Sequence, residues 1–169
     1  MRALVLGRFQ PFHCGHLKVV RDIAKDSEYL VIAIGSAQYS HSLENPFTAG
    51  ERYTMIFRTL KTEGIRNYHL VAIEDLHRYA AWVSHVVSQT PEFDVLYAHN
   101  PLSLRLFREG GFSVVELELH EPGKYSGTEI RRRIIAQEEW RDLVPKDVAS
   151  VIDEINGVDR LKELAYGCA

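Results

Sequence analysis

Residues 3–16 read ALVLGRFQPFHCGH, an apolar run that stops at Gly7 and continues through a loop into a helical pattern. The run Ala3–Leu6 shows no alternation of apolar and polar residues, which is typical of a parallel strand covered on both faces. A second run of this kind, LVIAI at Leu30–Ile34, ends at Gly35. We therefore predict a parallel sheet that contains these two strands.

Strand-like and helix-like segments alternate along the rest of the chain. Further strands are predicted at His69–Ile73, Val95–Ala98 and Val114–Leu119. Apolar residues at helical spacing predict helices between the strands, and further helices follow Ser126 and Pro145. Short connections between alternating elements predict one α/β domain over residues 1–169, with a doubly wound parallel sheet. Its core spans about residues 1–125 and its C-terminal helices lie within residues 126–169.

Two sequences typical of a capping box mark helix starts. The first runs from Thr48 to Glu51 and the second from Ser126 to Glu129. In each we expect the hydroxyl to accept from the glutamate's backbone N–H while the carboxylate accepts from the hydroxyl residue's own N–H.

Composition excludes several classes of protein. The 169 residues are 46% hydrophobic and 25% charged, and their formal charge is −3, so no overall basic surface for nucleic acid is expected. No apolar run approaches the roughly 20 residues of a membrane span, and the N-terminus lacks the features of a signal peptide. Cys14 and Cys168 make no disulfide framework. We expect a cytoplasmic protein with neither nucleic-acid nor membrane partners.

The loop after the first strand contains groups that suit a phosphate. His13 and His16 lie three residues apart at a predicted helix start, where free backbone N–H groups favour an anion. Arg8 adds a permanent charge, and Gly15 allows close approach of the backbone. Two alternatives compete with this interpretation. The histidines could ligate zinc together with Cys14, or they could simply cap the helix and pack.

A second candidate segment, YSGTEIRRR, covers residues 125–133. Ser126 and Thr128 place hydroxyls and free N–H groups at a helix start, and Arg131 follows within the first turns. The alternative is a capped helix with a solvated basic face. Neighbouring residues point about 100° apart on a helix, so at most one or two of residues 131–133 can face one ligand.

These residues resemble known motifs. HCGH at residues 13–16 resembles the H-x-G-H signature of the nucleotidyltransferase superfamily, and SGTEIR at residues 126–131 resembles its C-terminal phosphate motif. Four further stretches are similar to the archaeal nicotinamide-mononucleotide adenylyltransferases. They are GSAQ at 35–38, NPFTAGER at 45–52, AWV at 81–83 and NPL at 100–102. Together with GRFQPFH at 7–13, the resemblance covers nearly the whole chain.

The resemblance implies a Rossmann-like fold and an enzyme that joins ATP and nicotinamide mononucleotide into NAD, releasing pyrophosphate. Nicotinic acid mononucleotide is expected as a further acceptor. Mg²⁺ would be held by phosphates and water, without protein ligands. A homo-oligomer, commonly a hexamer, is expected.

The resemblance also implies roles for particular residues. His13, His16, Arg8 and Arg131 are expected to act in catalysis by positioning the phosphates and neutralising their charge. The ATP site would comprise Gly7, Arg8, Phe9, Gln10, His13, His16, Asn100, Tyr125, Ser126, Thr128 and Arg131. The mononucleotide site would comprise Gly35, Ser36, Phe47, Arg52 and Trp82.

Some alternatives remain open. Trp82 could stack on the nicotinamide ring or pack in the core, and Arg52 could hold the mononucleotide phosphate or pair with an acid on the helix surface. Glu44 and His99 depart from the pattern, where some relatives have a basic and a small residue. A sister enzyme acting on another phosphate acceptor, or a non-catalytic nucleotide sensor, would share the two phosphate motifs.

Overall fold

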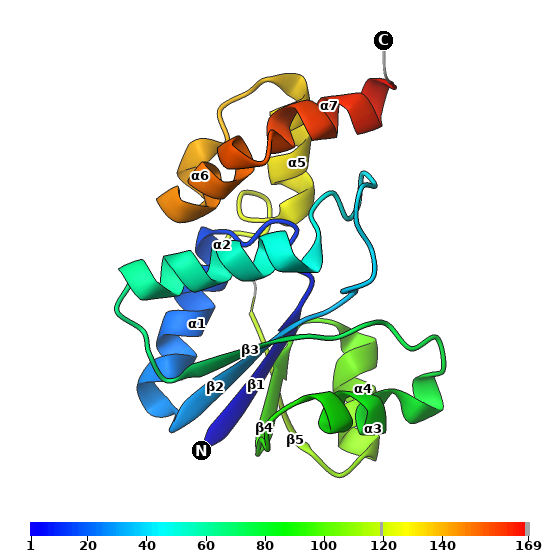
Figure 1. Cartoon of the computed structure of the whole chain (residues 1–169). Helices are drawn as coiled ribbons and strands as arrows, with labels where there is room; N and C mark the ends of the chain where they lie inside the picture. The colour runs from blue at the N-terminus through cyan, green and yellow to red at the C-terminus, as the bar shows by residue number, and fades with distance from the viewer. Residues whose placement is uncertain (119, 168–169) are drawn as a thin grey trace.

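The computed structural model describes residues 1–118 and 120–167 of the chain. Its sheet has five parallel strands in the order β3-β2-β1-β4-β5 (Figure 1), which confirms the doubly wound topology. The strands are β1 (Arg2–Gly7), β2 (Tyr29–Ile34), β3 (Tyr68–Ala72), β4 (Val95–Ala98) and β5 (Ser113–Glu116). The last strand is shorter than the predicted Val114–Leu119, and Leu119 lies outside the described residues.

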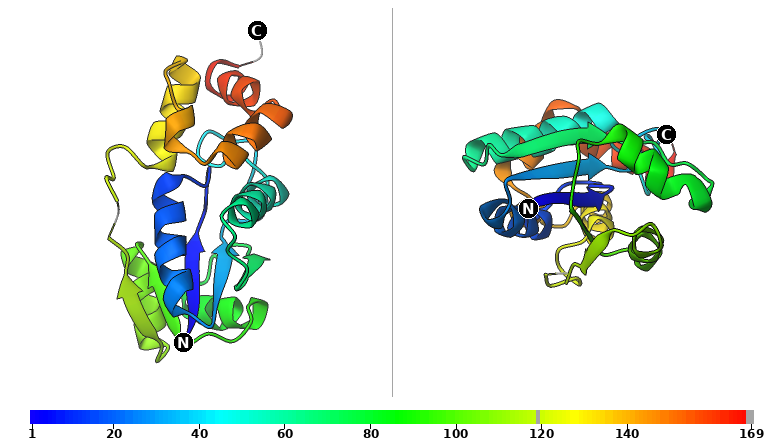
Figure 2. Two further views of the ribbon diagram at one scale, coloured as in Figure 1. Left: turned by 90° about the vertical axis from the view of Figure 1, so that its left-hand side faces the viewer. Right: turned by 90° about the horizontal axis from the view of Figure 1, so that it is seen from below.

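Helices cover the sheet and also extend beyond it. They are α1 (Cys14–Asp26), α2 (Ala49–Thr62), α3 (Tyr79–Gln89), α4 (Pro101–Glu109), α5 (Gly127–Ala136), α6 (Lys146–Glu154) and α7 (Gly157–Tyr166), with a 3₁₀ turn at Arg141–Leu143. Figures 1 and 2 show α5, α6 and α7 stacked beyond the carboxyl ends of the strands. Within the described residues no helix is long and apolar enough to cross a bilayer.

Burial explains why the first strands are apolar without alternation. Val5 and Ile32 pack in one cluster with side chains of α1 and α2, such as Val20. Their neighbours Leu4 and Val31 pack in a second cluster with α3 and α4. Because both faces of these central strands are covered, every side chain along them is selected to be apolar.

The two predicted capping boxes have different outcomes. At α2, Thr48 Oγ1 accepts from Glu51 N at 3.1 Å and Glu51 Oε2 accepts from Thr48 N at 2.9 Å, as predicted. At α5, Ser126 Oγ accepts from Glu129 N at 3.1 Å. The Glu129 carboxylate does not accept from Ser126 N, so that half of the prediction is wrong. The Glu129 carboxylate instead accepts hydrogen bonds from Arg132 and Arg133.

Helix α7 holds the long connection between β2 and α2. Arg160 donates two hydrogen bonds to the Glu51 carboxylate, at 2.7 and 2.8 Å, and one to Pro46 O at 3.0 Å. Burial opposes ionisation of Glu51, but hydrogen bonds from Arg160 and Thr48 outweigh it and leave the pKa of Glu51 below its usual value. The C-terminal helices therefore fix the segment that borders the carboxyl ends of the strands.

Replacing Arg160 tests how much its hydrogen bonds to Glu51 and Pro46 stabilise the fold. Arg160→Met should lower the free energy of unfolding by about 2 kcal/mol, because Pro46 O and the Glu51 carboxylate lose a charged donor. Urea titration at pH 7 measures the loss. The lowered pKa of Glu51 stabilises the fold above the usual glutamate range, and this stabilisation disappears as pH falls through the folded value. The difference between variant and wild type should therefore shrink in acid.

Arg105→Met is the matched control, because Arg105 pairs with Glu109 on the exposed face of α4. Its effect should stay within about 0.5 kcal/mol, as for other exposed helical pairs. Equal losses of unfolding free energy in the two variants would contradict a specific stabilising role of the Arg160 hydrogen bonds.

Candidate active site

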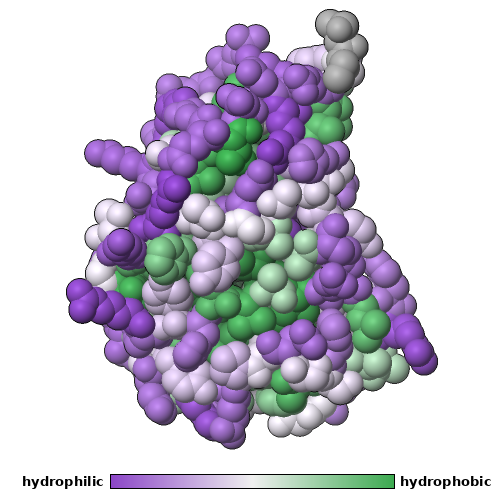
Figure 3. Space-filling model, viewed as in Figure 1, coloured by the Kyte–Doolittle hydropathy of each residue, from purple (hydrophilic) through white to green (hydrophobic). Residues whose placement is uncertain are grey.

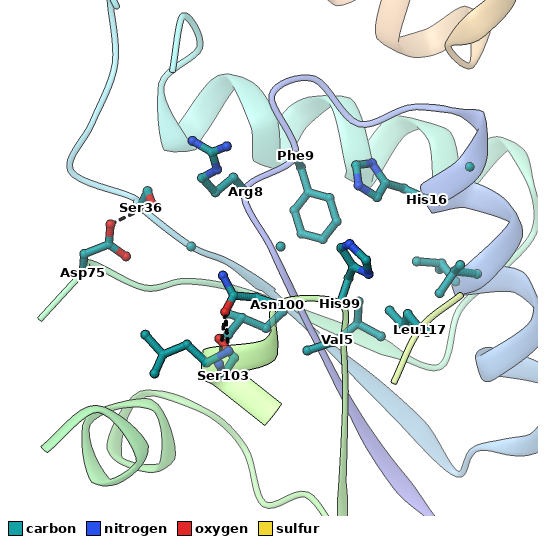
Figure 4. A pocket seen from close by; sticks show the side chains of 18 of the residues that line it. Val5, Arg8, Phe9, His16, Ser36, Asp75, His99, Asn100, Ser103 and Leu117 are labelled. Carbon is teal, nitrogen blue, oxygen red and sulfur yellow. Dashed lines mark hydrogen bonds between the residues drawn. The ribbon is translucent and has the colours of Figure 1, made fainter. Parts of the chain in front are cut away.

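A cavity of about 580 Å³ lies at the carboxyl ends of the strands (Figure 4), within the range usual for small-molecule sites. It borders the ends of β1 and β4, between which the direction of strand order reverses, as expected for a doubly wound sheet. Of the predicted site residues, those that line it are Gly7, Arg8, Phe9, His13, His16, Gly35, Ser36, Trp82, Asn100 and Tyr125.

The loop from β1 to α1 folds tightly on itself. A Cβ atom at Gly7 would lie 2.9 Å from the ring of Phe9, so no larger residue fits at this turn. The Phe9 ring also meets His16 edge-on, with centroids 4.9 Å apart. Phe9 therefore fixes both the end of the strand and one wall of the cavity.

His13 and His16 cap the first turn of α1 reciprocally. His13 Nδ1 accepts from His16 N and His16 Nδ1 accepts from His13 N, both at 3.3 Å. The two rings stack with centroids 3.5 Å apart. Because a backbone N–H occupies each Nδ1, each neutral ring carries its proton on Nε2. The capping that was an alternative interpretation is therefore present. It does not exclude a phosphate site, because the Nε2–H groups stay available to a ligand.

Both rings are neutral at pH 7. Burial lowers the pKa of His13 to about 4. Burial, together with the neighbouring His13, lowers the pKa of His16 well below its usual value. The pair therefore offers two N–H donors without a net charge, next to the free N–H groups of the helix.

The zinc alternative receives no support from the geometry. The Cys14 thiol lies 4.0 Å from Asp142 O, so it does not join the histidines. In the described part of the chain, no group of three His, Cys, Asp or Glu side chains is arranged to hold a metal ion.

Tyr125 and His120 form the wall contributed by the segment before α5. Their rings stack with centroids 5.5 Å apart, and Lys124 Nζ lies 4.8 Å from the centre of the Tyr125 ring. Tyr125 also approaches α1 closely, because a Cβ atom at Gly15 would lie 3.1 Å from Tyr125 Cβ and from His13 Nδ1. Glycine at position 15 lets the two predicted phosphate motifs meet.

Arg131 lies behind the β1–α1 loop and does not line the cavity. Its Nη1 donates to Gln10 O at 2.7 Å and its Nη2 to Thr128 Oγ1 at 3.4 Å. A Cβ atom at Gly127 would lie 2.9 Å from both Arg131 Nη1 and Gln10 O, so glycine admits this contact. Contact of Arg131, Ser126 and Thr128 with a ligand stays a prediction.

The other two arginines of this helix turn away from the loop. Arg132 pairs with Glu129 and Glu138, and Arg133 pairs with Glu129. None of the three arginines lines the cavity among the described residues, so the expectation that one or two of them serve a ligand stays a prediction.

Arg52 is fully buried and lies outside the cavity lining. It donates to four backbone carbonyls, those of Thr48 (3.2 Å), Arg8 (2.8 Å), Gly35 (2.8 Å) and Ser36 (3.1 Å). The surface ion pair with an acid is therefore wrong as an interpretation. In this structure Arg52 joins the ends of β1 and β2 to the start of α2, and its contact with a phosphate stays a prediction.

Gln10 and Phe47 also sit behind the cavity wall. Gln10 Nε2 donates to Phe47 O at 2.9 Å and Phe47 N donates to Gln10 Oε1 at 3.0 Å. Both residues are buried and neither lines the cavity, so they support the loops. Contact of either residue with a ligand stays a prediction.

The cavity also contains residues that the sequence did not single out as ligand-binding. Asp75 and His77 line it from the segment after β3, and His99 projects into it from the end of β4 (Figure 4). The rule that ligands bind beyond the carboxyl ends of parallel strands could have found all three. Trp82 lines the cavity and also packs against the second core cluster, so its two interpretations are compatible.

Comparison with known proteins decides the family. The family model for cytidylyltransferase-like proteins matches residues 4–133. The chain is 52% identical to the nicotinamide-nucleotide adenylyltransferase of Methanolobus tindarius, over 97% of this chain and 94% of that protein. It is 54% identical to the protein of that name from Methanosarcina mazei, over the same shares. The chain belongs to the nicotinamide-nucleotide adenylyltransferases of the cytidylyltransferase-like family.

Solved structures of low identity agree with the fold of this adenylyltransferase. A bifunctional NMN adenylyltransferase/ADP ribose pyrophosphatase from Francisella tularensis superposes with a TM-score of 0.70 at 19% identity, over 99% of this chain and 56% of that one. A putative nicotinate-nucleotide adenylyltransferase from Vibrio parahaemolyticus gives 0.61 at 14% identity, over 96% and 95%.

The neutral histidines of this adenylyltransferase make its stability depend on pH. His13 has a lowered pKa in the folded chain, so its contribution is complete above the unfolded value near 6.5 and is lost as pH falls toward about 4. Over that window the free energy of unfolding should fall by about 3 kcal/mol from His13.

Urea titrations at pH 7, 6, 5 and 4 measure this loss. His13→Asn is the comparison, because asparagine also caps helices but does not titrate. The variant should lose distinctly less stability on acidification. Parallel curves for the two proteins would contradict the assignment of a buried neutral His13.

Proposed function

We propose that this chain transfers the adenylyl group of ATP to nicotinamide mononucleotide, giving NAD and pyrophosphate. The observation that carries the proposal is the stacked pair of neutral imidazoles at the N-terminus of α1, with two Nε2–H donors directed to a cavity that also contains Arg8 and Trp82. The family supports the same reaction, because relatives at about half identity are named for it.

The chemistry needs no protein nucleophile. A phosphate oxygen of the mononucleotide attacks the α-phosphorus of ATP in line, the new oxygen–phosphorus bond forms, and the bond to the β-phosphate oxygen breaks. The phosphate dianion needs no general base, so the protein acts by positioning and electrostatic stabilisation. His13 and His16 donate from Nε2 to non-bridging phosphate oxygens, as the free N–H groups of α1 also do.

Three guanidinium groups make the region around the loop electropositive. After burial, repulsion from Arg8 is the largest cause that lowers the pKa of both Arg52 and Arg131, to about 10 for Arg52. An anion in the cavity relieves this repulsion. The Arg8 side chain is exposed, and its one hydrogen bond to residues 1–118 and 120–167 is to Asn45 Oδ1 at 3.5 Å, so it can follow the leaving pyrophosphate.

The buried arginines act through the backbone. Arg52 donates to Arg8 O and Arg131 donates to Gln10 O, on either side of Phe9. They hold the loop in one shape while their charges add to its potential. Trp82 and Ser36, farther along the cavity lining, are proposed to receive the mononucleotide, with the indole face stacked on the pyridinium ring.

We propose that Mg²⁺ enters with ATP and is held by phosphate oxygens and water. The cavity lining fits this arrangement, because it offers imidazole, amide and guanidinium groups to the phosphates and only two carboxylates, Asp75 and Glu118, among the described residues. When bound, the cation would neutralise phosphate charge. The chain's own residues orient the two substrates.

A homo-oligomer, expected as a hexamer, and placement in the cytoplasm are also proposed. An exposed groove along edge strand β3 supports association, since the stacked rings of Tyr53 and Phe57 border it. Figure 3 shows apolar residues exposed near the middle of the face viewed. Light scattering of the purified chain tests the oligomer, and a monomeric mass would contradict it.

The reaction is tested by pyrophosphate release from ATP and Mg²⁺ with nicotinamide mononucleotide, pantetheine phosphate or flavin mononucleotide in parallel. We expect release with the first acceptor only, with NAD formed in equal amount. Activity with another acceptor would favour a sister transferase. Nucleotide binding without release in any arm would favour a sensing module.

His16→Ala tests the role of the imidazole pair. Loss of one donor to the phosphates should lower kcat by about a hundredfold, or about 3 kcal/mol of transition-state stabilisation. Lys18→Ala is the control, because Lys18 is exposed on the same helix and lines neither this cavity nor the groove along β3. Near-normal turnover of His16→Ala in steady-state kinetics would contradict the proposed mechanism.

A further inference from the structure

A carboxylate lies on the far side of the cavity from the histidines. Asp75 follows β3 and lines the cavity together with Ser36, across from His16 (Figure 4). None of the roles described above for the phosphates or for the loop supports requires a negative charge there. A negative charge in a cavity proposed to bind two phosphorylated substrates therefore needs its own explanation.

The position of Asp75 is fixed by its neighbours. Ser36 Oγ donates to Asp75 Oδ2 at 2.7 Å. Gln38 binds the backbone on both sides, since its Nε2 donates to Asp75 O at 3.1 Å and its Oε1 accepts from Asp75 N at 2.8 Å. Three hydrogen bonds from two residues of one segment thus set where the carboxylate lies, which is the pattern of a preorganised binding group.

The charge of Asp75 is not used within the protein. No ion pair to Asp75 occurs among residues 1–118 and 120–167, although its charge acts through space on Arg52. Arg52 directs its hydrogen bonds to backbone carbonyls instead. The Oδ1 atom of Asp75 has no partner in the same part of the chain, so it is free to accept a hydrogen bond.

The same segment is tied to the aromatic wall. His85 Nε2 lies 3.0 Å from Glu74 O, and the His85 ring packs against Trp82 with centroids 5.8 Å apart. His85 therefore connects the residue before Asp75 to the helix that carries Trp82. A flat ring stacked on Trp82 would therefore lie in the same cavity as Asp75, beside the segment that carries it.

We infer that Asp75 is a specificity-determining residue that selects a mononucleotide with a carboxamide on its pyridinium ring over one with a carboxylate. The inference rests on the proposed function. A carboxamide N–H can donate to Asp75, whose charge also suits the pyridinium cation. A ring carboxylate can donate nothing and places a second negative charge beside the first, which binding sites use to exclude wrong partners.

The test compares nicotinamide mononucleotide with nicotinic acid mononucleotide in the wild type, Asp75→Asn and Glu74→Gln. Asparagine keeps the shape of aspartate, still accepts from Ser36 and can donate to a carboxylate. Glu74→Gln removes the same charge one residue away, from an exposed side chain outside the cavity lining. The ratio of kcat/KM for the two acceptors is measured with saturating ATP.

We expect the wild type to prefer nicotinamide mononucleotide. Asp75→Asn should lower the ratio of kcat/KM for the amide to kcat/KM for the acid by about tenfold or more, because kcat/KM rises for the acid and falls for the amide. Glu74→Gln should keep the wild-type ratio, and KM for ATP should be unchanged in both variants. A parallel loss for both acceptors in Asp75→Asn, with the ratio unchanged, would overturn the inference and indicate a structural role. Asp75→Ser serves as the second variant if Asp75→Asn does not fold, and should shift the ratio in the same direction.

Calorimetric titration separates this inference from the proposed reaction. The affinities of the two mononucleotides give the same ratio without turnover. If the wild type shows no turnover but binds the amide more tightly in a way that depends on Asp75, the proposed reaction is contradicted and the specificity stands. Turnover in the wild type with equal affinities in every variant would retain the reaction and reject the role of Asp75.

Discussion

The site depends on two hydrogen bonds across the first turn of α1, where His13 and His16 each accept the other's backbone N–H at Nδ1. These bonds satisfy helix N–H groups that would otherwise have no partner inside the helix. They also fix the orientation and tautomer of both rings, and burial keeps them neutral. One small structural unit therefore starts the helix and, in the proposed mechanism, supplies two aligned donors for phosphate oxygens.

The remainder of the structure maintains this unit under electrostatic strain. Arg52 and Arg131 bind the carbonyls of Arg8 and Gln10 from behind the loop, at the cost of bringing like charges together. The C-terminal helices carry Arg131, and through Arg160 they also hold the segment before α2. In the proposed mechanism a substrate phosphate relieves this repulsion, so the site would be prepared for an anion before one binds.

The sequence predicted the sheet, the order of elements and part of the cavity wall, because strand burial, glycine turns and helix starts are local signals. It did not distinguish residues that touch the cavity from those that support it. Gln10 and Arg52 lie in the recognised motifs, yet the Gln10 side chain bonds the backbone of Phe47, and the Arg52 side chain bonds the carbonyls of Arg8 and Gly35. Which partner a polar side chain binds depends on the folded chain. The same holds for Glu129, which accepts from Arg132 and Arg133 and not from Ser126 N. Asp75 lacked a motif of its own, and its hydrogen bond to Ser36 forms because β2 and β3 pair and bring their ends together.

The proposed phosphate site depends on the protonation of the His13 and His16 rings, and ¹⁵N NMR of the imidazole nitrogens measures it directly. At pH 7 we expect His13 and His16 each to show an unprotonated Nδ1 and a protonated Nε2, and binding of an ATP analogue should shift the Nε2–H signals. A doubly protonated ring, or a proton on Nδ1 of either residue, would contradict the reciprocal cap and the phosphate site built on it.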